Sequence, residues 1–508
     1  MDLSFLDIFR RTPKPQPEKT TGRRAYDSAS SGYRTDGWVT PSTDANAEVE
    51  AGLVTTRNRS RDAYRNQPIY SGAVDKMTDK VVGTGIRPNP ATGDKGLDRN
   101  AVKLWDKWSR VCCPGSRSTV YAMEALLCRS LVVSGEVFAR PRWRSRDSMP
   151  GLPPVQIQVL ESDMLDDTMT ESKPNGSVII QGVEFNAAGQ RRFYYFYKQH
   201  PGAMLIGTGL YGERAKVASR DVLHLMKEDR PGQVRGTPIM QNVISGLYDL
   251  SGYMDAERYR AKGVASIMAF VEDGNPDYGD PVGVDGVAPA SDSSGDLVED
   301  ANGNPIEQLR PGWIAYLPDG KTIKLNSSAV PSGVSDYISA HMHELAAGTP
   351  LSHASFSGDL QGTSFASIKF GLTEQLTAIR SFREQVFIPL ALDPIWAWFV
   401  DAAIANGLLP DNPALYMPEW SQPMVESADR LSDAKAARME MRNTTHSRRG
   451  IIAGNGKDPD AVDADIRLDM VNRQESGKDP LIVSDGDPSQ VSTSGLFQPG
   501  LEDDSSSE

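Results

Sequence analysis

The chain has 508 residues, of which 39% are apolar and 24% are charged. This composition is typical of a globular protein with a sizeable core, and it excludes a wholly disordered or fibrous chain. The formal net charge of −13 argues against a protein that grips nucleic acid over most of its surface, because such binding depends on basic side chains that neutralise phosphates. A local basic patch remains compatible with this charge.

Three cysteines, Cys112, Cys113 and Cys128, are too few for a disulfide framework in a chain of this length, so we expect reduced thiols. The first residues, MDLSFLDIFRR, lack the basic start and the apolar segment of a secretory signal. The most apolar long stretch, residues 386–409, contains Asp393, Pro394 and Asp401, so we expect no membrane span. The sequence therefore predicts a soluble protein that is made in the cytoplasm.

The first part of the chain predicts an arm followed by helices. Residues 1–50 are rich in Pro, Ser, Thr, Gly and charged side chains, which indicates a flexible N-terminal arm. Apolar residues then recur at spacings of three and four up to Val82, where a glycine-rich turn follows. Residues 98–113 and 119–134 carry the apolar stripes of two further helices.

Between about residues 135 and 226 the apolar period changes to two, which predicts a β-rich block. Strand patterns lie at 136–140, 155–160, 177–180 and 192–197. A long helix is predicted next, over 238–262, because Pro238 suits a first helical turn and an apolar stripe follows it. The stripe consists of Ile239, Val243, Leu247, Leu250 and Met254.

Residues 272–302 contain nine acidic residues and no Lys or Arg, which predicts a long exposed loop. The acids at its centre are Asp277, Asp280, Asp285, Asp292 and Asp296. Strand patterns return at 312–317 and 321–325, and helices are predicted for 334–347, 364–407 and 427–476. The tail, 477–508, is rich in Ser, Asp and Pro and predicts disorder.

Motifs for catalysis are sparse. Gly207–Gly212 spells GxGxxG, but a dinucleotide site needs a helix that opens at the last glycine, and the residues that follow are strand-like. A turn is therefore favoured, with a nucleotide-dependent enzyme kept as the alternative. His341 and His343 have a metal-like spacing near His353, but side chains at i and i+2 of a helix diverge. We expect no catalytic residue, metal or cofactor, and the sequence favours a structural or binding protein.

Arg140, Arg142, Arg144 and Arg146 alternate around Trp143. Two interpretations stay open: a stripe that binds nucleic acid, and a solvated edge strand or a salt-bridge face between subunits.

Several windows, taken in order, resemble the lambda-type bacteriophage portal proteins. They are RDAYRN (61–66), VVGTGIRP (81–88), LWDKW (104–108), VSGEVF (133–138), VQIQVLESDMLD (155–166), DVLHL (221–225), RPGQVRGTP (230–238) and SGDLQ (357–361). Their order and spacing make the resemblance specific, and it extends over most of the chain. One departure is SFASIK (364–369), where lambda-type portals usually have Asn-Tyr-Ser-Ser-x-Arg. Roles of single residues are therefore not transferred to these positions.

The resemblance implies an α+β portal-protein fold with a β-rich wing, a helical stem, an α/β clip and a helical crown, assembled in a ring of usually twelve copies. It implies the following division of the chain: N-terminal arm 1–50, wing 51–237, stem helix 238–262, clip 263–333, second stem helix with channel loop and long helix 334–426, crown 427–476, and acidic tail 477–508. The acidic loop at 272–302 falls where a protruding clip is expected.

The resemblance also implies a function. The ring would lie at one vertex of the phage capsid, serve as the channel for DNA packaging and ejection, and dock the terminase motor and neck or tail completion proteins. Its implied partners are further copies of itself, major capsid and scaffold proteins, and double-stranded DNA that passes without tight binding; no membrane is implied. The protein would be found in the virion and, during assembly, in the host cytoplasm. A different virion neck component stays open as an alternative.

Three sets of residues are the expected sites. The stripe from Ile239 to Met254 would pack the stem, and the five central aspartates of 272–302 would face the clip's partners. The loop before the helix at 364–407 would line the channel with Ser357, Asp359, Gln361, Thr363 and Ser364. In that loop Thr363 or Ser364 is a suitable helix N-cap.

Overall fold

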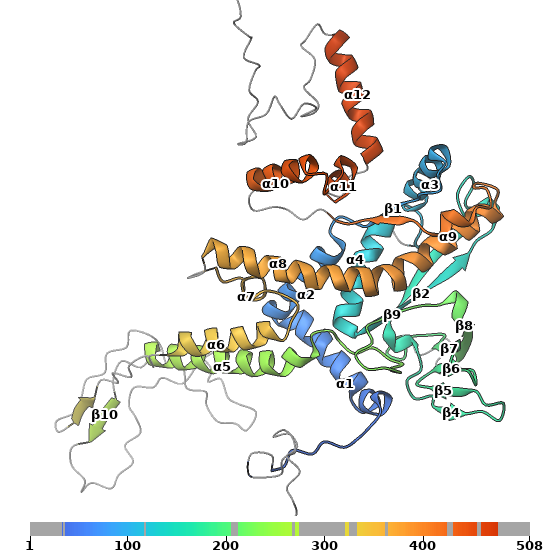
Figure 1. The fold of residues 1–508 in the computed structure, drawn as a ribbon. Helices are drawn as coiled ribbons and strands as arrows, with labels where there is room; N and C mark the ends of the chain where they lie inside the picture. The colour runs from blue at the N-terminus through green and yellow to red at the C-terminus, as the bar shows by residue number, and fades with distance from the viewer. Residues whose placement is uncertain are drawn as a thin grey trace, which may run out of the picture.

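The computed structural model describes residues 33, 36–115, 118–204, 212–266, 270–273, 321–324, 333–360, 364–423, 430–454 and 459–475. Every structural statement below concerns these residues. They form helices and antiparallel sheets that are largely segregated along the chain, which confirms the α+β class (Figure 1).

Four helices open the described chain: α1 (Ala45–Asn66), α2 (Pro68–Val82), α3 (Lys95–Trp108) and α4 (Val120–Ser134). Local sequence explains their ends. Asp44, Asp94 and Thr119 cap α1, α3 and α4 through side-chain oxygens that accept backbone N–H groups, and α2 begins at a proline. Because α1 begins at Ala45, the last residues of the predicted arm are helical.

Two antiparallel sheets follow. The three-stranded sheet has the order β3-β2-β9, formed by β3 (Val155–Leu160), β2 (Glu136–Trp143) and β9 (Leu223–Met226). The five-stranded sheet runs in sequence order through β4 (Glu171–Ser172), β5 (Val178–Ile180), β6 (Val183–Phe185), β7 (Arg191–Tyr197) and β8 (Arg214–Ala218). Short 3₁₀ turns lie at Arg146–Ser148, Ser162–Met164 and Ser219–Asp221. The β-rich block is thus confirmed.

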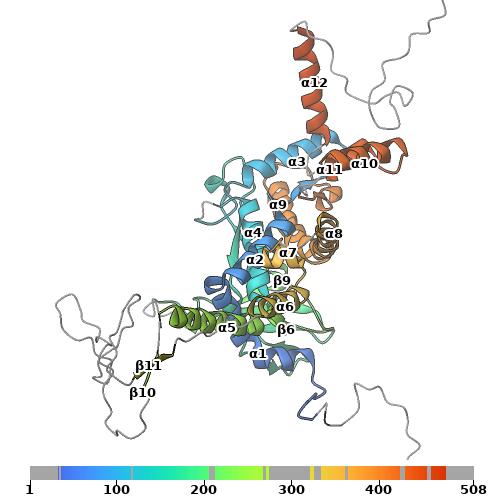
Figure 2. The ribbon, with the colours of Figure 1, turned by 90° about the vertical axis from the view of Figure 1, so that its left-hand side faces the viewer.

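The rest of the chain is mainly helical. It comprises α5 (Gln241–Ser266), the antiparallel pair β10 (Phe270–Asp273) and β11 (Lys321–Lys324), α6 (Val334–Ala347), α7 (His353–Ser357), α8 (Phe365–Phe382), a π-helical segment (Arg383–Leu392), α9 (Asp393–Ala405), a 3₁₀ turn (Pro413–Tyr416), β12 (Glu419–Ser421), α10 (Arg430–Arg442), α11 (Arg448–Gly454) and α12 (Pro459–Glu475). Strand β12 pairs with β1 (Arg87–Asn89). In both views α5 and α6 run side by side out of the body, and α10–α12 gather at the opposite end from α1 (Figures 1 and 2).

The main hydrophobic core lies between the helices and one face of the β3-β2-β9 sheet. Its centre is a cluster of aromatic rings from α3 and α9, with Trp105, Trp108, Trp396 and Phe399 at centroid distances of 5.0–5.2 Å. Because side chains alternate along a strand, Phe138 of β2 faces the other way and packs with Tyr194 and Phe196 in a second core between the two sheets.

One continuous helical run, Ala366–Ala405, is long and apolar enough to cross a membrane by length and composition. More than half of its most apolar window is buried inside the protein, as in the core helix of a soluble protein, so this is weak evidence for a span.

Candidate functional site

The site implied by the resemblance consists of the α5–α6 pair and the loop that leads into α8. Three members of the predicted α5 stripe, Val243, Leu247 and Leu250, are buried in the main core, and Met254 packs against it while partly exposed. Ile239 also packs there, but α5 begins at Gln241, so Ile239 lies before the helix. Its backbone N–H instead donates to the carbonyl of Val132, because the chain is still held against α4 at this point.

The α5–α6 pair is closely packed at one glycine. A Cβ on Gly246 would lie 2.7 Å from Cδ2 of Leu345, a distance that real Cβ atoms essentially never show. Further along, Tyr253 of α5 contacts Tyr337 of α6 with ring centroids 4.8 Å apart. At the base, the Asn242 side chain donates to the carbonyl of Gly348 at 2.9 Å. The pair is therefore a built unit rather than two helices that merely lie alongside each other.

The segment before α8 contains a short helix, α7, which the sequence did not predict; Ser352 caps it by accepting from the N–H of Ser355. Gln375 of α8 is buried, and its Oε1 accepts from both serine hydroxyls, at 3.1 Å from Ser352 and 2.9 Å from Ser355. On the other side, the Lys76 ammonium of α2 donates to the carbonyl of Ser355 at 2.6 Å. These bonds fix the start of the loop to two helices of the body.

His353 of α7 and His343 of α6 stack with ring centroids 3.5 Å apart. Burial and the neighbouring His343 lower the pKa of His353, against the opposing effect of Asp359. His341 lies elsewhere on α6, stacked on Tyr337. The three histidines therefore do not form one ligand set.

The structure describes three of the five expected channel residues. The Ser357 hydroxyl donates to the carbonyl of His353 and accepts from the N–H of Asp359, and Gly358 between them has φ 76°. Asp359 is exposed. Ser364 is the N-cap of α8 and accepts from the N–H of Ser367, which confirms the expectation that Thr363 or Ser364 caps this helix. Gln361 and Thr363 lie outside the described residues.

A buried polar network holds the chain that enters α5. Arg235 donates to Glu136 of β2 through Nε at 2.8 Å and Nη2 at 2.5 Å, and both side chains are fully buried. His224 of β9 donates through Nε2 to the other oxygen of Glu136 at 3.0 Å, since a carboxylate only accepts. Burial alone would raise the pKa of Glu136, but Arg235 and His224 hold it far below its ordinary value.

Two glycines, Gly135 and Gly236, allow the chain before α5 to pack closely against the turn between α4 and β2. A Cβ on Gly135 would lie 2.2 Å from the carbonyl carbon of Thr237, and one on Gly236 would lie 2.2 Å from the carbonyl oxygen of Gly135. The N–H of Gly236 also donates to Glu136 at 3.0 Å. The RPGQVRGTP window was visible in the sequence, but its partner Glu136 lies 99 residues before Arg235, so no local pattern could have revealed the network.

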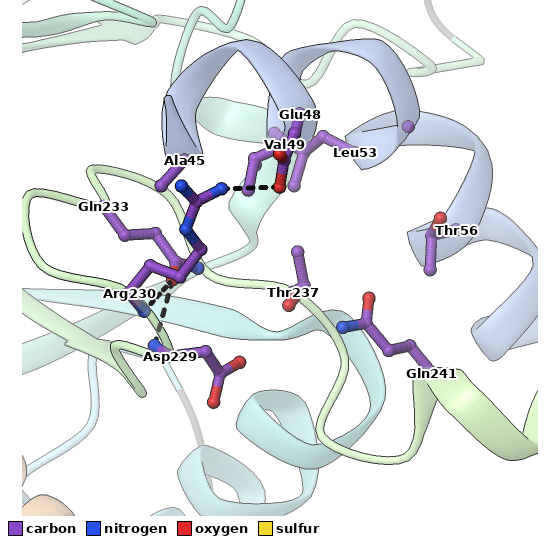
Figure 3. Close-up of a pocket in the computed structure, with 11 residues that line it drawn as sticks. Ala45, Glu48, Val49, Leu53, Thr56, Asp229, Arg230, Gln233, Thr237 and Gln241 are labelled. Atoms are coloured by element: carbon purple, nitrogen blue, oxygen red, sulfur yellow. Dashed lines mark hydrogen bonds and ion pairs between the residues drawn. The ribbon is translucent and has the colours of Figure 1, made fainter. Parts of the chain in front are cut away.

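A pocket of about 230 Å³ opens beside the same segment, between α1, the loop at 229–237 and the start of α5 (Figure 3). The Arg230 guanidinium spans its rim and pairs with Glu48 of α1 at 2.7 Å. Thr56, Thr237 and Gln241 line the wall towards α5. The lining is mixed in polarity and holds no group with catalytic geometry.

The structure adds little evidence for the other candidate sites. Residues 205–211 of the GxGxxG loop lie outside the described residues, but the element that follows Gly212 is strand β8 and not the helix that a dinucleotide site requires. The five clip aspartates, Asp277, Asp280, Asp285, Asp292 and Asp296, also lie outside the described residues. The structure does bring ligand atoms of Glu161, Asp163 and His200 within 4.8 Å. However, Arg57 and Arg61 already pair with Asp163.

Comparisons with known proteins bear on the whole chain. The chain is 24% identical over 483 residues to a "Probable portal protein" of Halomonas phage phiHAP-1. This alignment covers 90% of this chain and 89% of the relative. Among solved structures, it is similar to chains in the "Neck of empty GTA particle" and the "Neck of native GTA particle", at 13% and 12% identity and TM-scores of 0.42. These cover 85% and 81% of this chain, and 94% of each neck chain.

Residues 31–383 match the lambda family of phage portal proteins. This match covers well over half of the chain and includes α5, α6, α7 and α8. The chain therefore belongs to the lambda family of phage portal proteins.

Proposed function

We propose that this portal protein forms a closed ring of twelve copies at one vertex of the phage capsid. The observation that carries the proposal is the α5–α6 pair of a lambda-family portal chain, which leaves large aromatic side chains in solvent. Tyr248 and Tyr259 of α5 are 72% and 74% exposed. Tyrosine is enriched at protein interfaces, and neighbouring copies in a ring would bury these side chains.

The same ring would surround the DNA channel. The loop from Ser357 to Ser364 follows the anchor that Lys76 and Gln375 form at Ser355. It carries mainly small polar residues, and Asp359 is exposed. A lining of this kind would let a duplex slide, because each fixed cation would bind phosphate and release counterions. Gln361, Thr363 and Ser364 would offer weak, exchangeable hydrogen bonds.

The acidic segment 272–302 would be the surface that faces the terminase motor during packaging and the neck or tail proteins afterwards. Its nine acids fit a basic partner surface. The first two, Glu272 and Asp273, end strand β10, which follows α5 in the chain. Deletion of residues 276–298 should leave rings intact but impair packaging or tail joining. Failure of ring formation without this segment would instead mean that it belongs to the core.

The ring is tested by mass. Twelve copies of a 55.4 kDa chain weigh about 660 kDa in light scattering. Replacement of exposed Tyr248 and Tyr259 by serine should lower the assembled fraction without lowering the thermal stability of the monomer. A mass of one to four copies for the unmodified protein at micromolar concentration would overturn the proposal.

A further inference from the structure

The arginine row, defined as Arg140 and Arg142 of β2 with Arg144 directly after the strand, has an unusual set of partners. Arg140 and Arg142 donate through Nε to the Gln158 side-chain oxygen, at 3.1 and 2.7 Å, and Arg144 donates to Gln156 at 2.8 Å. Nearby, Arg146 donates to the backbone carbonyl of Asn406. All these acceptors are neutral oxygens, and none of these arginines forms an ion pair with a described carboxylate. The row therefore keeps its full positive charge.

The glutamines hold the arginines in place without neutralising them. Gln158 and Gln156 lie on β3 directly across from Arg140 and Arg142. A glutamate at either position would accept the same hydrogen bond and cancel a charge. Burial and the charge of Arg142 lower the pKa of Arg140, which reflects the repulsion within the row. With Nε engaged, the two Nη groups of each guanidinium remain for an external anion.

The spacing of the row matches a regular polyanion. Alternate residues on a strand lie roughly 6.6 Å apart on one face, and phosphates of one DNA strand rise about 3.4 Å each along the axis. The row therefore presents cations at regular intervals, as a phosphate backbone presents anions. Pro141 and Trp143 point to the opposite face, where Pro141 is buried and Trp143 is exposed. The face that carries the row is therefore polar at these positions.

The row is far from the channel loop. Arg146 contacts Asn406 just after the end of α9, whereas Ser364 lies at the start of α8. The continuous helix between these points spans 40 residues and is about 60 Å long. Figure 1 shows β2 beside α9 and α7 beside the other end of this helix. At physiological salt the screening length is about 8 Å, so the row acts locally despite the net charge of −13.

We propose that the arginine row is a sequence-independent binding site for the phosphate backbone of double-stranded DNA that lies outside the channel. The proposal does not depend on the ring. It assigns to the wing a contact with DNA that the channel function does not require.

The test uses covalently closed circular duplex DNA, which cannot thread a closed ring. Binding by the full-length protein is measured by gel shift and fluorescence anisotropy between 50 and 200 mM salt. Arg142→Gln with Arg144→Gln should weaken binding about tenfold or more, and should reduce the slope of log affinity against log salt by about 1.8, or 0.9 for each phosphate contact.

A second variant keeps every arginine. Gln156→Glu with Gln158→Glu should weaken binding to a similar degree, because the new carboxylates neutralise the row in place. Arg220→Gln removes an arginine that is exposed at another site and should leave binding unchanged. The proposal is overturned if circular DNA does not bind, if the variants bind it as the unmodified protein does, or if poly-glutamate binds the row more tightly than DNA at equal salt.

Discussion

Single buried carboxylates show how strongly local surroundings set charge in this protein. Glu124 of α4 and Glu136 of β2 are both fully buried, yet their pKa values move in opposite directions. Glu136 faces Arg235 and stays ionised. Glu124 accepts only the N–H of Ile86, and burial raises its pKa to about 8. The difference lies in the partner and not in the depth of burial.

The raised pKa of Glu124 predicts a pH dependence. Its folded pKa of about 8 exceeds the ordinary value of 4.5, so its contribution to stability is complete below pH 4.5 and is lost as pH rises through 8. Between these values the free energy of unfolding should fall by about 1.4 kcal/mol per pH unit from this group. Glu124→Gln should remove that slope in urea unfolding from pH 5 to 8, whereas Glu50→Gln on the exposed side of α1 should not.

The buried ion pair of Arg235 and Glu136 predicts a large loss of stability when one of its two side chains is replaced. Arg235→Met leaves a buried carboxylate without its partner and should lower the free energy of unfolding by about 3–5 kcal/mol. The double variant with Glu136→Gln should lose less than the two single variants added together, since no charge is left uncompensated. Lys198→Met breaks the exposed pair with Glu213 and should cost about 1 kcal/mol or less. Simple additivity of the buried pair would contradict this account.

At the scale of elements, long helices are positioned by a few side chains rather than by their own propensity. Arg383 begins the π-helical segment between α8 and α9, and its guanidinium donates to the carbonyls of Val81 at 2.7 Å and Lys80 at 2.5 Å. It thereby caps the C-terminal end of α2. Pro389 within the segment lacks an N–H, which is consistent with the departure from regular α-helical bonding.

The α5–α6 pair offers a matched test of helix packing. Gly246→Leu should force α5 away from Leu345, because even a Cβ there is 2.7 Å from Cδ2. Gly252→Leu, six residues along the same helix, adds the same side chain where nothing lies within 4 Å. We expect a lower melting temperature and loss of assembly, by calorimetry and light scattering, for Gly246→Leu alone. Equal behaviour of the two variants would mean that α5 and α6 do not need this close contact.

At the scale of the whole molecule, a net charge of −13 coexists with a local cationic row and an exposed acidic residue at the channel loop. Negative and positive side chains are thus concentrated in different parts of the molecule. The loop that we propose to meet moving DNA presents Asp359, while the unneutralised arginines lie at the far end of the long helix. In our proposals, the loop contacts DNA that moves through the channel, and the arginine row binds DNA that lies outside it.

Asp359→Lys reverses the charge of the loop in every copy. If the loop lines the bore, the new phosphate contacts should slow or stall DNA packaging, most severely at low salt, because the contacts are screened by ions. Single-molecule packaging velocity with the variant ring measures this. Asp94→Asn, at the cap of α3 outside the loop, serves as the control. An unchanged low-salt velocity, or a ring structure with the loop on its outer wall, would rule out the channel role.

The sequence by itself determined most of the long elements and the family. Apolar periods of 3.6 and 2 located α6, the stripe of α5 and the main strands, and Ser364 was recognisable as a cap, because these signals arise between residues a few positions apart. Only the tertiary structure decided that Gln375 holds Ser352 and Ser355, that the short helix α7 lies before α8, and that Glu136 anchors Arg235 across 99 residues. It also showed that the arginine row faces glutamines and not carboxylates. Such pairings depend on which distant segments pack together, and local sequence periodicity carries no record of that.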